Sequence, residues 1–273
     1  LQQDSHVSGV EFIGTGYSAA MPSSVNGEYG VKIVGSRVEV DNCKFSLLEH
    51  GVIFGGLTVL NRCIIKDNLI YANKGGITAF QNIEYSTIIN NRIYDGYIGI
   101  WLRDEANLLI SNNTITYNTV GIRWDGLASN SDHDIVIGNQ FNHCDTMAYV
   151  LKNNTSLDFI GNHFMVGKIV MGTTDSVRLH TFNGNGFGST TFSIINGREI
   201  NFVNNSFYNP STWTNSVGVK KYLNVGETND ALPGASISGT DNNIVRIDGT
   251  ASLQDSKVSI SDNGDITAGN SGT

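Results

Sequence analysis

A short segment with a fixed asparagine recurs along most of this chain. The asparagine lies two residues before an apolar residue and follows a short β-branched run, as in the segments IINNRI (88–93), ISNNTI (110–115) and FVNNSF (202–207). The asparagines assigned to the repeat are spaced 20 to 26 residues apart: Asn42, Asn68, Asn91, Asn113, Asn139, Asn162, Asn185 and Asn205. A repeat of this length constrains the fold more strongly than local propensity does, because it is typical of stacked solenoid units.

A glycine followed by valine or isoleucine keeps the same period, at Gly51, Gly76, Gly99 and Gly121. Each repeat therefore contains two or three short apolar strands between polar turns. One such unit cannot bury its apolar face alone, whereas stacked units share a continuous core. The sequence predicts an all-β fold, a parallel β-helix of about eight coils. Its repeated asparagines are expected to adopt the left-handed backbone conformation and to form an amide ladder from coil to coil.

The composition agrees with this class and excludes others. Charged residues make up 15% of the chain, which has 31 Gly, 3 Pro and 32 Asn and a net charge of −8. The negative charge argues against a nucleic-acid partner, and the absence of an 18-residue apolar run argues against membrane insertion. We expect Cys43, Cys63 and Cys144 to be buried free thiols, made in a reducing cytoplasm. The chain starts with Leu-Gln-Gln-Asp, without Met, so we expect it to be part of a longer protein.

The repeat fades after about Asn205, and the texture of the chain then changes. We expect the β-helix to occupy residues 1–221 and a separate segment to occupy residues 222–273. This segment is rich in Ser, Thr, Asp, Asn and Gly, and has short strand patterns at 244–247 and 257–260. It has too few large apolar residues to fold alone at this size. A capping or trimerisation role is therefore expected, because solenoid ends need covering.

Aligning the coils on the repeat predicts a strip of outward side chains. Residues next to inward isoleucines point outward in a strand, which places Trp101, Arg123 and Tyr149 in one column and Arg103 beside it. Aromatic faces stack on sugar rings and arginines bond sugar hydroxyls, so these four residues are the predicted glycan-binding strip. The alternative is that Trp101 packs under a loop or a partner subunit, with Arg123 stacked on it.

Several carboxylates lie on the loops beside this strip. Glycoside hydrolysis requires two carboxyl groups about 5–9.5 Å apart, and adjacent coils can provide that spacing. Asp104, Asp125 and Glu105 are the predicted catalytic residues, with Asp104 and Asp125 as the first pair to test. The alternative is that these acids serve the turns. The groups Asp132-His133-Asp134 and His143, Cys144 and His163 lack a recognised ligand spacing, so neither a metal nor a cofactor is predicted.

Residues from about 5 to 210 resemble the right-handed parallel β-helices of the pectate-lyase-like superfamily. Within that superfamily they most resemble the shaft of a bacteriophage tailspike. The N-x-[IF] ladder and the Gly-[VI] repeat carry this resemblance. It implies a homotrimer in a virion tail, attached to the rest of the tail, that acts outside the cell, binds a host surface polysaccharide or teichoic acid, and hydrolyses it. Two alternatives remain open: a binding rod without turnover, and a secreted bacterial polysaccharide lyase or epimerase.

Overall fold

Strands two to nine residues long make up the regular structure, and no helix occurs in the part of the chain that the computed structural model describes. The described residues are 1–16, 22, 27–55, 59–80, 83–103, 105–125, 133–151, 156–172, 177–195, 197–209, 211–214, 218–222, 224–226, 243–247, 253–260 and 266–268. Within these segments, nothing forms a helix long and apolar enough to cross a membrane.

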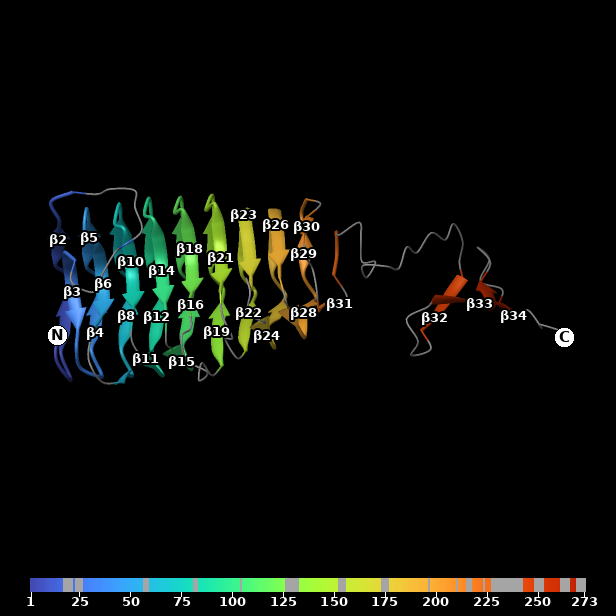
Figure 1. The fold of residues 1–273 in the computed structure, drawn as a ribbon, viewed down its shortest axis with the longest axis horizontal. Helices are drawn as coiled ribbons and strands as arrows, with labels where there is room; N and C mark the ends of the chain where they lie inside the picture. Colours follow the sequence, from blue (N-terminus) through green and yellow to red (C-terminus); the bar gives the residue numbers. More distant parts are fainter. Residues whose placement is uncertain are drawn as a thin grey trace. The chain divides into compact units, whose positions relative to one another are not determined.

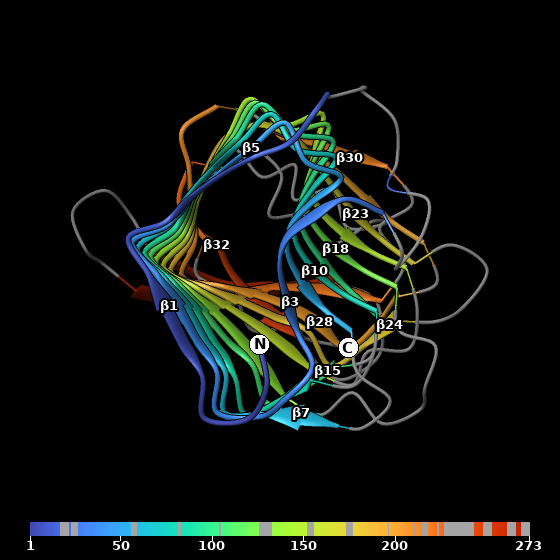
Figure 2. The same cartoon turned by 90° about the vertical axis from the view of Figure 1, so that its left-hand side faces the viewer.

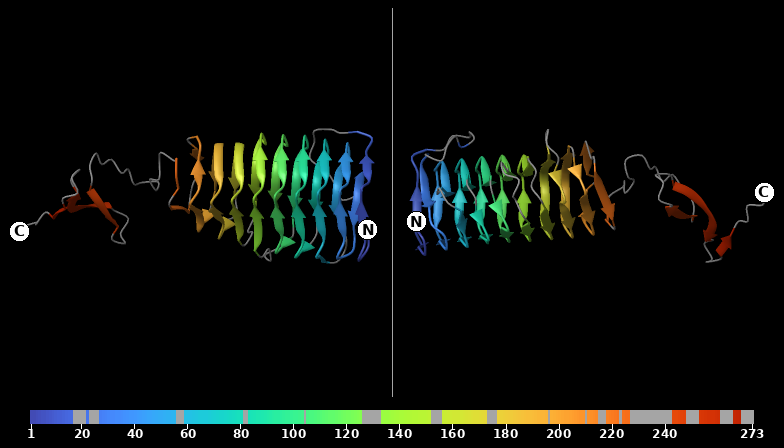
Figure 3. Two further views of the ribbon diagram at one scale, coloured as in Figure 1. Left: turned by 180° about the vertical axis from the view of Figure 1, so that it is seen from behind. Right: turned by 60° about the horizontal axis from the view of Figure 1, so that its bottom comes forward.

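Parallel strands stack coil upon coil in residues Leu1–Thr228, the first of two units (Figures 1 and 3). Figure 2, taken along the stack, shows the strands of successive coils superimposed around a common core. The first face is a ten-stranded parallel sheet made of β1 (His6–Ser8), β4 (Glu39–Asp41), β8 (Ile64–Lys66), β12 (Thr87–Ile89), β16 (Leu109–Ser111), β19 (Asp134–Ile137), β22 (Leu157–Ile160), β25 (Thr181–Asn183), β28 (Ile200–Val203) and β31 (Val219–Tyr222).

Two further faces meet at a corner of each coil. The second face contains β2 (Glu11–Ile13), β5 (Lys44–Ser46), β9 (Leu69–Tyr71), β13 (Arg92–Tyr94), β17 (Thr114–Thr116) and β20 (Gln140–Asn142). The third face contains β3 (Tyr29–Ile33), β6 (His50–Phe54), β10 (Gly75–Ala79), β14 (Ile98–Leu102), β18 (Val120–Trp124) and β21 (Thr146–Val150). Because β23 (His163–Met171) and β26 (Gly186–Ile194) run through the corner, the two faces are joined into one 16-stranded sheet.

Short strands complete the coils. β29 (Ser206–Phe207) and β30 (Thr212–Thr214) pair with β26. A three-stranded sheet contains β7 (Leu60–Asn61), β11 (Ile83–Glu84) and β15 (Glu105–Ala106). A two-stranded sheet contains β24 (Val177–Arg178) and β27 (Gly197–Arg198). The predicted fold class is confirmed: the chain is a right-handed parallel β-helix of about seven turns, where the repeat suggested about eight.

The second unit, Asn229–Thr273, contains three antiparallel strands. These are β32 (Asn243–Ile247), β33 (Leu253–Ile260) and β34 (Ile266–Ala268). β32 and β33 include the two strand patterns expected at 244–247 and 257–260. The capping or trimerising role of this segment stays a prediction.

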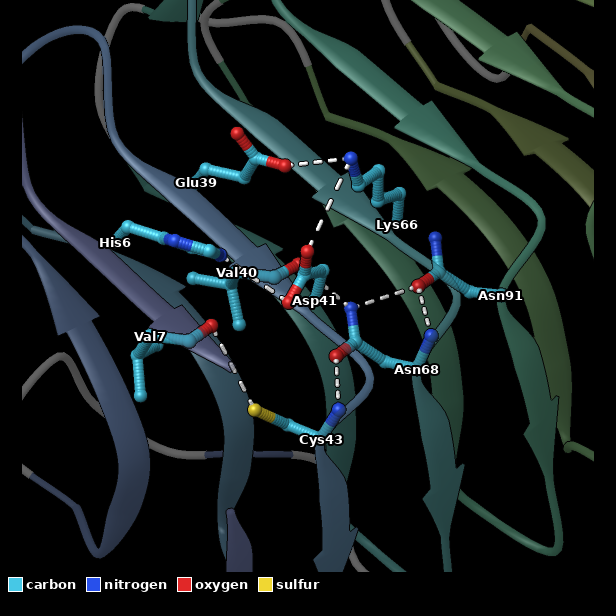
Figure 4. A network of polar contacts seen from close by, with 9 residues as sticks. All are labelled: His6, Val7, Glu39, Val40, Asp41, Cys43, Lys66, Asn68 and Asn91. Carbon is cyan, nitrogen blue, oxygen red and sulfur yellow. Dashed lines mark hydrogen bonds and ion pairs between the residues drawn. The ribbon is translucent and has the colours of Figure 1, made fainter. Parts of the chain in front are cut away.

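The predicted asparagine ladder is present and buried at the corner between the first and second faces. The Asn91 amide nitrogen Nδ2 donates to Oδ1 of Asn113 at 3.0 Å, and Asn113 repeats the bond to Asn139 at 2.9 Å. Figure 4 shows the first rungs, in which Asn68 Oδ1 accepts the backbone N–H of Cys43 and Asn68 donates to Asn91. The ladder extends one rung past the predicted set, to Asn224.

Two details of the predicted ladder are wrong. Cys43, not Asn42, occupies the ladder column, because the Cys43 N–H donates to Asn68. The left-handed residue is also the one before each rung: Asn42 (φ 48°), Asn90 (57°) and Asn112 (53°) have positive φ, and Gly138 and Gly161 do so in later coils. The two roles are therefore divided between neighbours, with one residue turning the chain and the next bonding between coils.

The glycine repeat marks close approach of successive coils. A Cβ atom on Gly76 would lie 2.4 Å from the carbonyl oxygen of Gly99, and one on Gly99 would lie 2.6 Å from that of Gly121. Side chains are therefore excluded from this column.

Beside it, the core changes from isoleucine to phenylalanine along the stack: Phe141, Phe164 and Phe187 form a file of stacked rings 4.8 and 5.3 Å apart. The three cysteines are buried and free, as predicted.

Candidate functional site

The predicted outer column exists on the third face. Thr78, Trp101, Arg123 and Tyr149 are paired in register across β10, β14, β18 and β21. The inward column beside it is also as predicted, since Ile77, Ile100 and Ile122 are fully buried. Registry between coils therefore brings the predicted binding residues together.

Trp101 is the centre of a packed cluster on this outer face, not an open platform. Its ring is 5% exposed, with Phe80 packed edge-on at 4.8 Å. The Arg123 guanidinium lies over the Trp101 ring at 5.3 Å and over the Tyr149 ring at 5.5 Å. The cluster is therefore a rigid arrangement of rings and cations whose edges, at the half-buried Tyr149 and Phe80, face outward.

Asp125 ties this cluster together. One carboxylate oxygen accepts the Trp101 indole N–H at 2.8 Å, and the other accepts Nε–H of Arg123 at 2.6 Å. With both oxygens engaged by donors, Asp125 serves as an acceptor that orients the tryptophan and the arginine. Its predicted partner, Asp104, lies outside the described residues, and Glu105 is placed only as a residue of β15.

Arg103 contributes a second cation at the edge of the cluster. Its guanidinium lies 5.6 Å from the Phe80 ring centroid and 6.0 Å from that of Trp101. The Nε atom of Arg103 is buried and donates no hydrogen bond. This side chain is therefore held by two rings and retains hydrogen-bonding capacity.

An open groove lies beside the cluster, where the corner between the second and third faces is shortened. Six residues separate Phe141 from Ala148 in one coil, whereas four separate the paired Phe164 from Ile169 in the next. The last full corner therefore overhangs β23, which passes straight beneath it. Gly167 allows this passage, since a Cβ atom there would lie 2.0 Å from the Cys144 carbonyl oxygen.

The groove has a volume of about 630 Å³. Its wall is the corner turn 143–145, and its floor is formed by β23 and β26; the lining residues are His143, Cys144, Asp145, Val166, Gly167, Lys168, Ser189 and Thr191. At its upper rim, the His143 imidazole stacks on the Tyr117 ring at 5.0 Å, and Tyr117 is 59% exposed. The groove thus combines the exposed His143 imidazole with the Asp145 carboxylate, the Lys168 ammonium and the hydroxyls of Ser189 and Thr191.

The sequence reasoning missed this groove, although the sequence contains a signal for it. In the coils before the groove, the inward residue of the third face lies nine residues after its ladder asparagine, as in Asn68 and Ile77 or Asn139 and Ala148. In the next coil, Ile169 lies seven residues after Asn162. The following coil keeps this shortening, since Phe192 lies seven residues after Asn185. The recess therefore lies where two shortened coils follow the last full corner.

A charged group on the first face completes the set of polar clusters. His6, Glu39 and Asp41 place potential ligand atoms within 4.8 Å of one another, beside Lys66 (Figure 4). The other groups considered from sequence are dispersed: Asp134, the first residue of β19, is fully buried, while His133 pairs with Asp158 at 2.8 Å on the surface. Asp132 lies outside the described residues.

The stacked parallel coils define the chain as a right-handed parallel β-helix protein that carries its candidate site on the outer surface. The family described as NosD, periplasmic copper-binding protein, matches residues 6–155, which is more than half of the 273 residues. The chain therefore belongs to the NosD family. A comparison with curated protein sequences found no significant match.

Solved structures with a similar fold include an enzyme and a viral protein. DFA-IIIase from Arthrobacter chlorophenolicus A6 in complex with DFA-III is 15% identical with a TM-score of 0.58, over 79% of this chain and 57% of that one. The same enzyme without its lid is 14% identical with a TM-score of 0.57, over 80% and 63%. The tailspike of Acinetobacter baumannii phage AM24 is 14% identical with a TM-score of 0.47, over 80% and 48%. At these identities the likeness establishes the fold alone, and this chain spans less than two thirds of each.

Proposed function

We propose that this chain binds a surface polysaccharide on its outer face, in the corner groove and along the neighbouring aromatic cluster. The observation that carries the proposal is the groove itself. Its volume of about 630 Å³ lies within the range of roughly 300–1,000 Å³ typical of ligand sites. The exposed His143 ring, stacked on Tyr117, offers a face for a sugar, and Asp145, Lys168 and Thr191 offer hydrogen bonds to its hydroxyls.

The fold likeness is compatible with this function. DFA-IIIase, a carbohydrate-active enzyme with a similar β-helix, is known in complexes with DFA-III and with GF2. Shared architecture does not transfer an activity, because function resides in sites placed on a fold. The support therefore comes from the groove and its lining residues, with the comparison as context.

Filling the groove is expected to weaken polysaccharide binding. Ser189→Trp places a large ring on the exposed groove floor, so affinity for the best polymer on an array of capsule, O-antigen and teichoic acid samples should fall at least about tenfold, as for loss of a central contact. The matched control is Asn183→Trp, another exposed position, on the first face. Calorimetric titration of both variants decides the matter: equal affinities for the two would place the glycan elsewhere, and no binding by the unmodified chain would favour a purely structural rod.

The tailspike role expected from the sequence is a more specific version of this proposal. It adds a homotrimer, attachment to the rest of a virion tail, and action at a host cell surface; the family description, which names the periplasm, favours a location outside the cytoplasm. Sedimentation of the purified chain separates these roles, because a trimer fits the tailspike and a monomer fits a secreted lyase or epimerase.

Hydrolysis of the bound polymer remains a prediction that depends on Asp104 and Asp125. If both are catalytic, Asp104→Asn and Asp125→Asn should each abolish the release of reducing ends while binding persists. Asp125→Asn retains one acceptor for Trp101 or Arg123, so the cluster should stay folded. Release of reducing ends by both variants would remove these residues from the chemistry.

Copper, named in the family description, bears on the ligands that this chain offers. Copper(I) sites use thiolates and thioethers, but Cys43, Cys63 and Cys144 lie in separate places, with each Sγ within 3.7–3.8 Å of a backbone carbonyl oxygen. Burial also raises the pKa of the Cys144 thiol to about 11, which disfavours the thiolate. Among the described residues, the group that fits a divalent ion is therefore His6 with Glu39 and Asp41.

A further inference from the structure

We propose that His6, Glu39 and Asp41 form a binding site for a divalent transition-metal ion on the first face of the β-helix. β1 and β4 present the three side chains, with His6 paired to Glu39 and Ser8 to Asp41. One ligand atom from each lies within 4.8 Å of the others. An imidazole with two carboxylates is a donor set that suits Zn²⁺ and Cu²⁺. Figure 4 shows His6 reaching Asp41, and Lys66 reaching both Glu39 and Asp41, beside the first residues of the asparagine ladder.

Asp41 is the anchor of the proposed site. The residue is 7% exposed, and the Ser8 and His6 side chains hold the pKa of its carboxyl below the ordinary value. Nε2 of His6 lies 3.2 Å from Oδ1 of Asp41. Two ligands bonded at about 2.0–2.2 Å to a tetrahedral ion lie roughly 3.3–3.5 Å apart, so little movement is needed to bring both atoms onto one ion. A buried carboxylate oxygen that faces an imidazole nitrogen at this distance can share one cation with that nitrogen.

Lys66 occupies the same cluster as a built-in cation. Its Nζ atom lies 2.6 Å from Oε1 of Glu39 and 3.9 Å from Oδ2 of Asp41. The position therefore already attracts positive charge. The Lys66 side chain is 36% exposed and carries its charge on a flexible stem, so it can leave towards solvent when a metal ion arrives. Lys66 and the metal ion are thus competitors for Glu39.

The site joins the first coil of the β-helix to the second. His6 lies on β1, while Glu39 and Asp41 lie on β4, the strand that pairs with β1 in the first face. A bound ion should therefore clamp β1 onto β4 and slow its local opening.

The test is metal titration of the complete, untagged chain after removal of metal with EDTA. Calorimetry with Zn²⁺ should find one ion per chain, and electron paramagnetic resonance with Cu²⁺ should show coupling to one nitrogen. His6→Ala should weaken binding at least about tenfold. Lys66→Met should tighten it about two- to fivefold, the effect of removing one exposed ion pair. Hydrogen exchange of β1 should slow on adding Zn²⁺, and only when His6 is present.

Two controls make the outcome decisive. Glu11→Gln breaks the ion pair of Glu11 with Lys44, also 2.6 Å long but without a nearby histidine, and should leave affinity unchanged. His133→Ala removes the other exposed histidine that is paired with a carboxylate, Asp158, and should also change nothing. The proposal is overturned if the unmodified chain binds no Zn²⁺ at micromolar concentration. It is equally overturned if His6→Ala binds as well as the unmodified chain, or if His133→Ala removes binding.

Discussion

Replacing Asn139 with alanine should destabilise the β-helix by about 3–5 kcal/mol, the range for breaking a buried hydrogen-bond network. Oδ1 of Asn139 accepts both the backbone N–H and the side-chain N–H of Asn113, at 2.8 and 2.9 Å. Its Nδ2 donates to the carbonyl oxygen of Ile110 and to Oδ1 of Asn162. Alanine leaves all of these buried partners without the hydrogen bonds that Asn139 makes to them. Urea unfolding followed by circular dichroism measures the loss.

Asn183→Ala is the matched control for this change. Asn183 lies on β25, about two rungs' length of chain further on, but its side chain is exposed. We expect its substitution to change the free energy of unfolding by less than about 0.5 kcal/mol. If both alanine variants lose the same stability, the ladder contributes nothing specific and the repeat needs another explanation.

The second large effect concerns two buried titratable residues, Asp134 and His180. They share a column of residues at the start of the first-face strands. This column holds Ser86, Asp134 and His180 in alternate coils, and Leu108 and Leu157 in the coils between. Asp134 accepts the Leu108 N–H at 2.8 Å, and Nδ1 of His180 accepts the Leu157 N–H at 3.0 Å. Burial raises the pKa of Asp134 to about 7 and lowers the pKa of His180 to about 3. Both groups are thus neutral in the folded state over a wide pH range.

Their effects on stability have opposite signs. The stability that neutral Asp134 provides is complete below its ordinary pKa of 3.8 and is lost as the pH rises towards about 7. The stability that neutral His180 provides is complete above its ordinary pKa of 6.5 and is lost as the pH falls towards about 3. Between about pH 4 and 6.5 the two contributions should nearly cancel.

Asparagine substitutions should separate the two contributions, because asparagine keeps an acceptor for the backbone N–H. Relative to the unmodified chain, Asp134→Asn should gain on the order of 4 kcal/mol between pH 4 and pH 7, since a pKa change of one corresponds to about 1.4 kcal/mol. His180→Asn should show the reverse trend, with its relative gain growing as the pH falls below 6.5. Unfolding curves at several pH values measure both. A difference that does not vary with pH in either variant contradicts the assigned protonation states.

The fold could be predicted because the same residue types recur at positions that become neighbours only when the coils are stacked. Asn91, Asn113 and Asn139 bond to one another across coils, and the column containing Trp101, Arg123 and Tyr149 pairs in the predicted register. The error at Asn42 arose because two asparagines often stand side by side, one turning the chain and one forming the rung. The hydrogen bond from the Cys43 N–H to Asn68 and the positive φ of Asn42 distinguish these positions.

The candidate site was predicted less well, because register fixes which residues are neighbours but not how they pack. Trp101 lies in the expected column, yet Phe80 and two arginines cover it, so the expected flat platform is a filled cluster. The groove depends on an overhang between coils of unequal length. Such a recess is a difference between neighbouring repeats, and an alignment that seeks what the repeats share passes over it.

The shortened corner at Gly167 has a consequence for engineering. Each coil meets only the coils directly above and below it, so removing two residues from one corner disturbs the stack locally and leaves the asparagine rungs in place. Deleting corner residues from one or more successive coils could then create recesses of chosen depth in such a β-helix. Ligand specificity would be set by where along the rod the trimmed coil is placed.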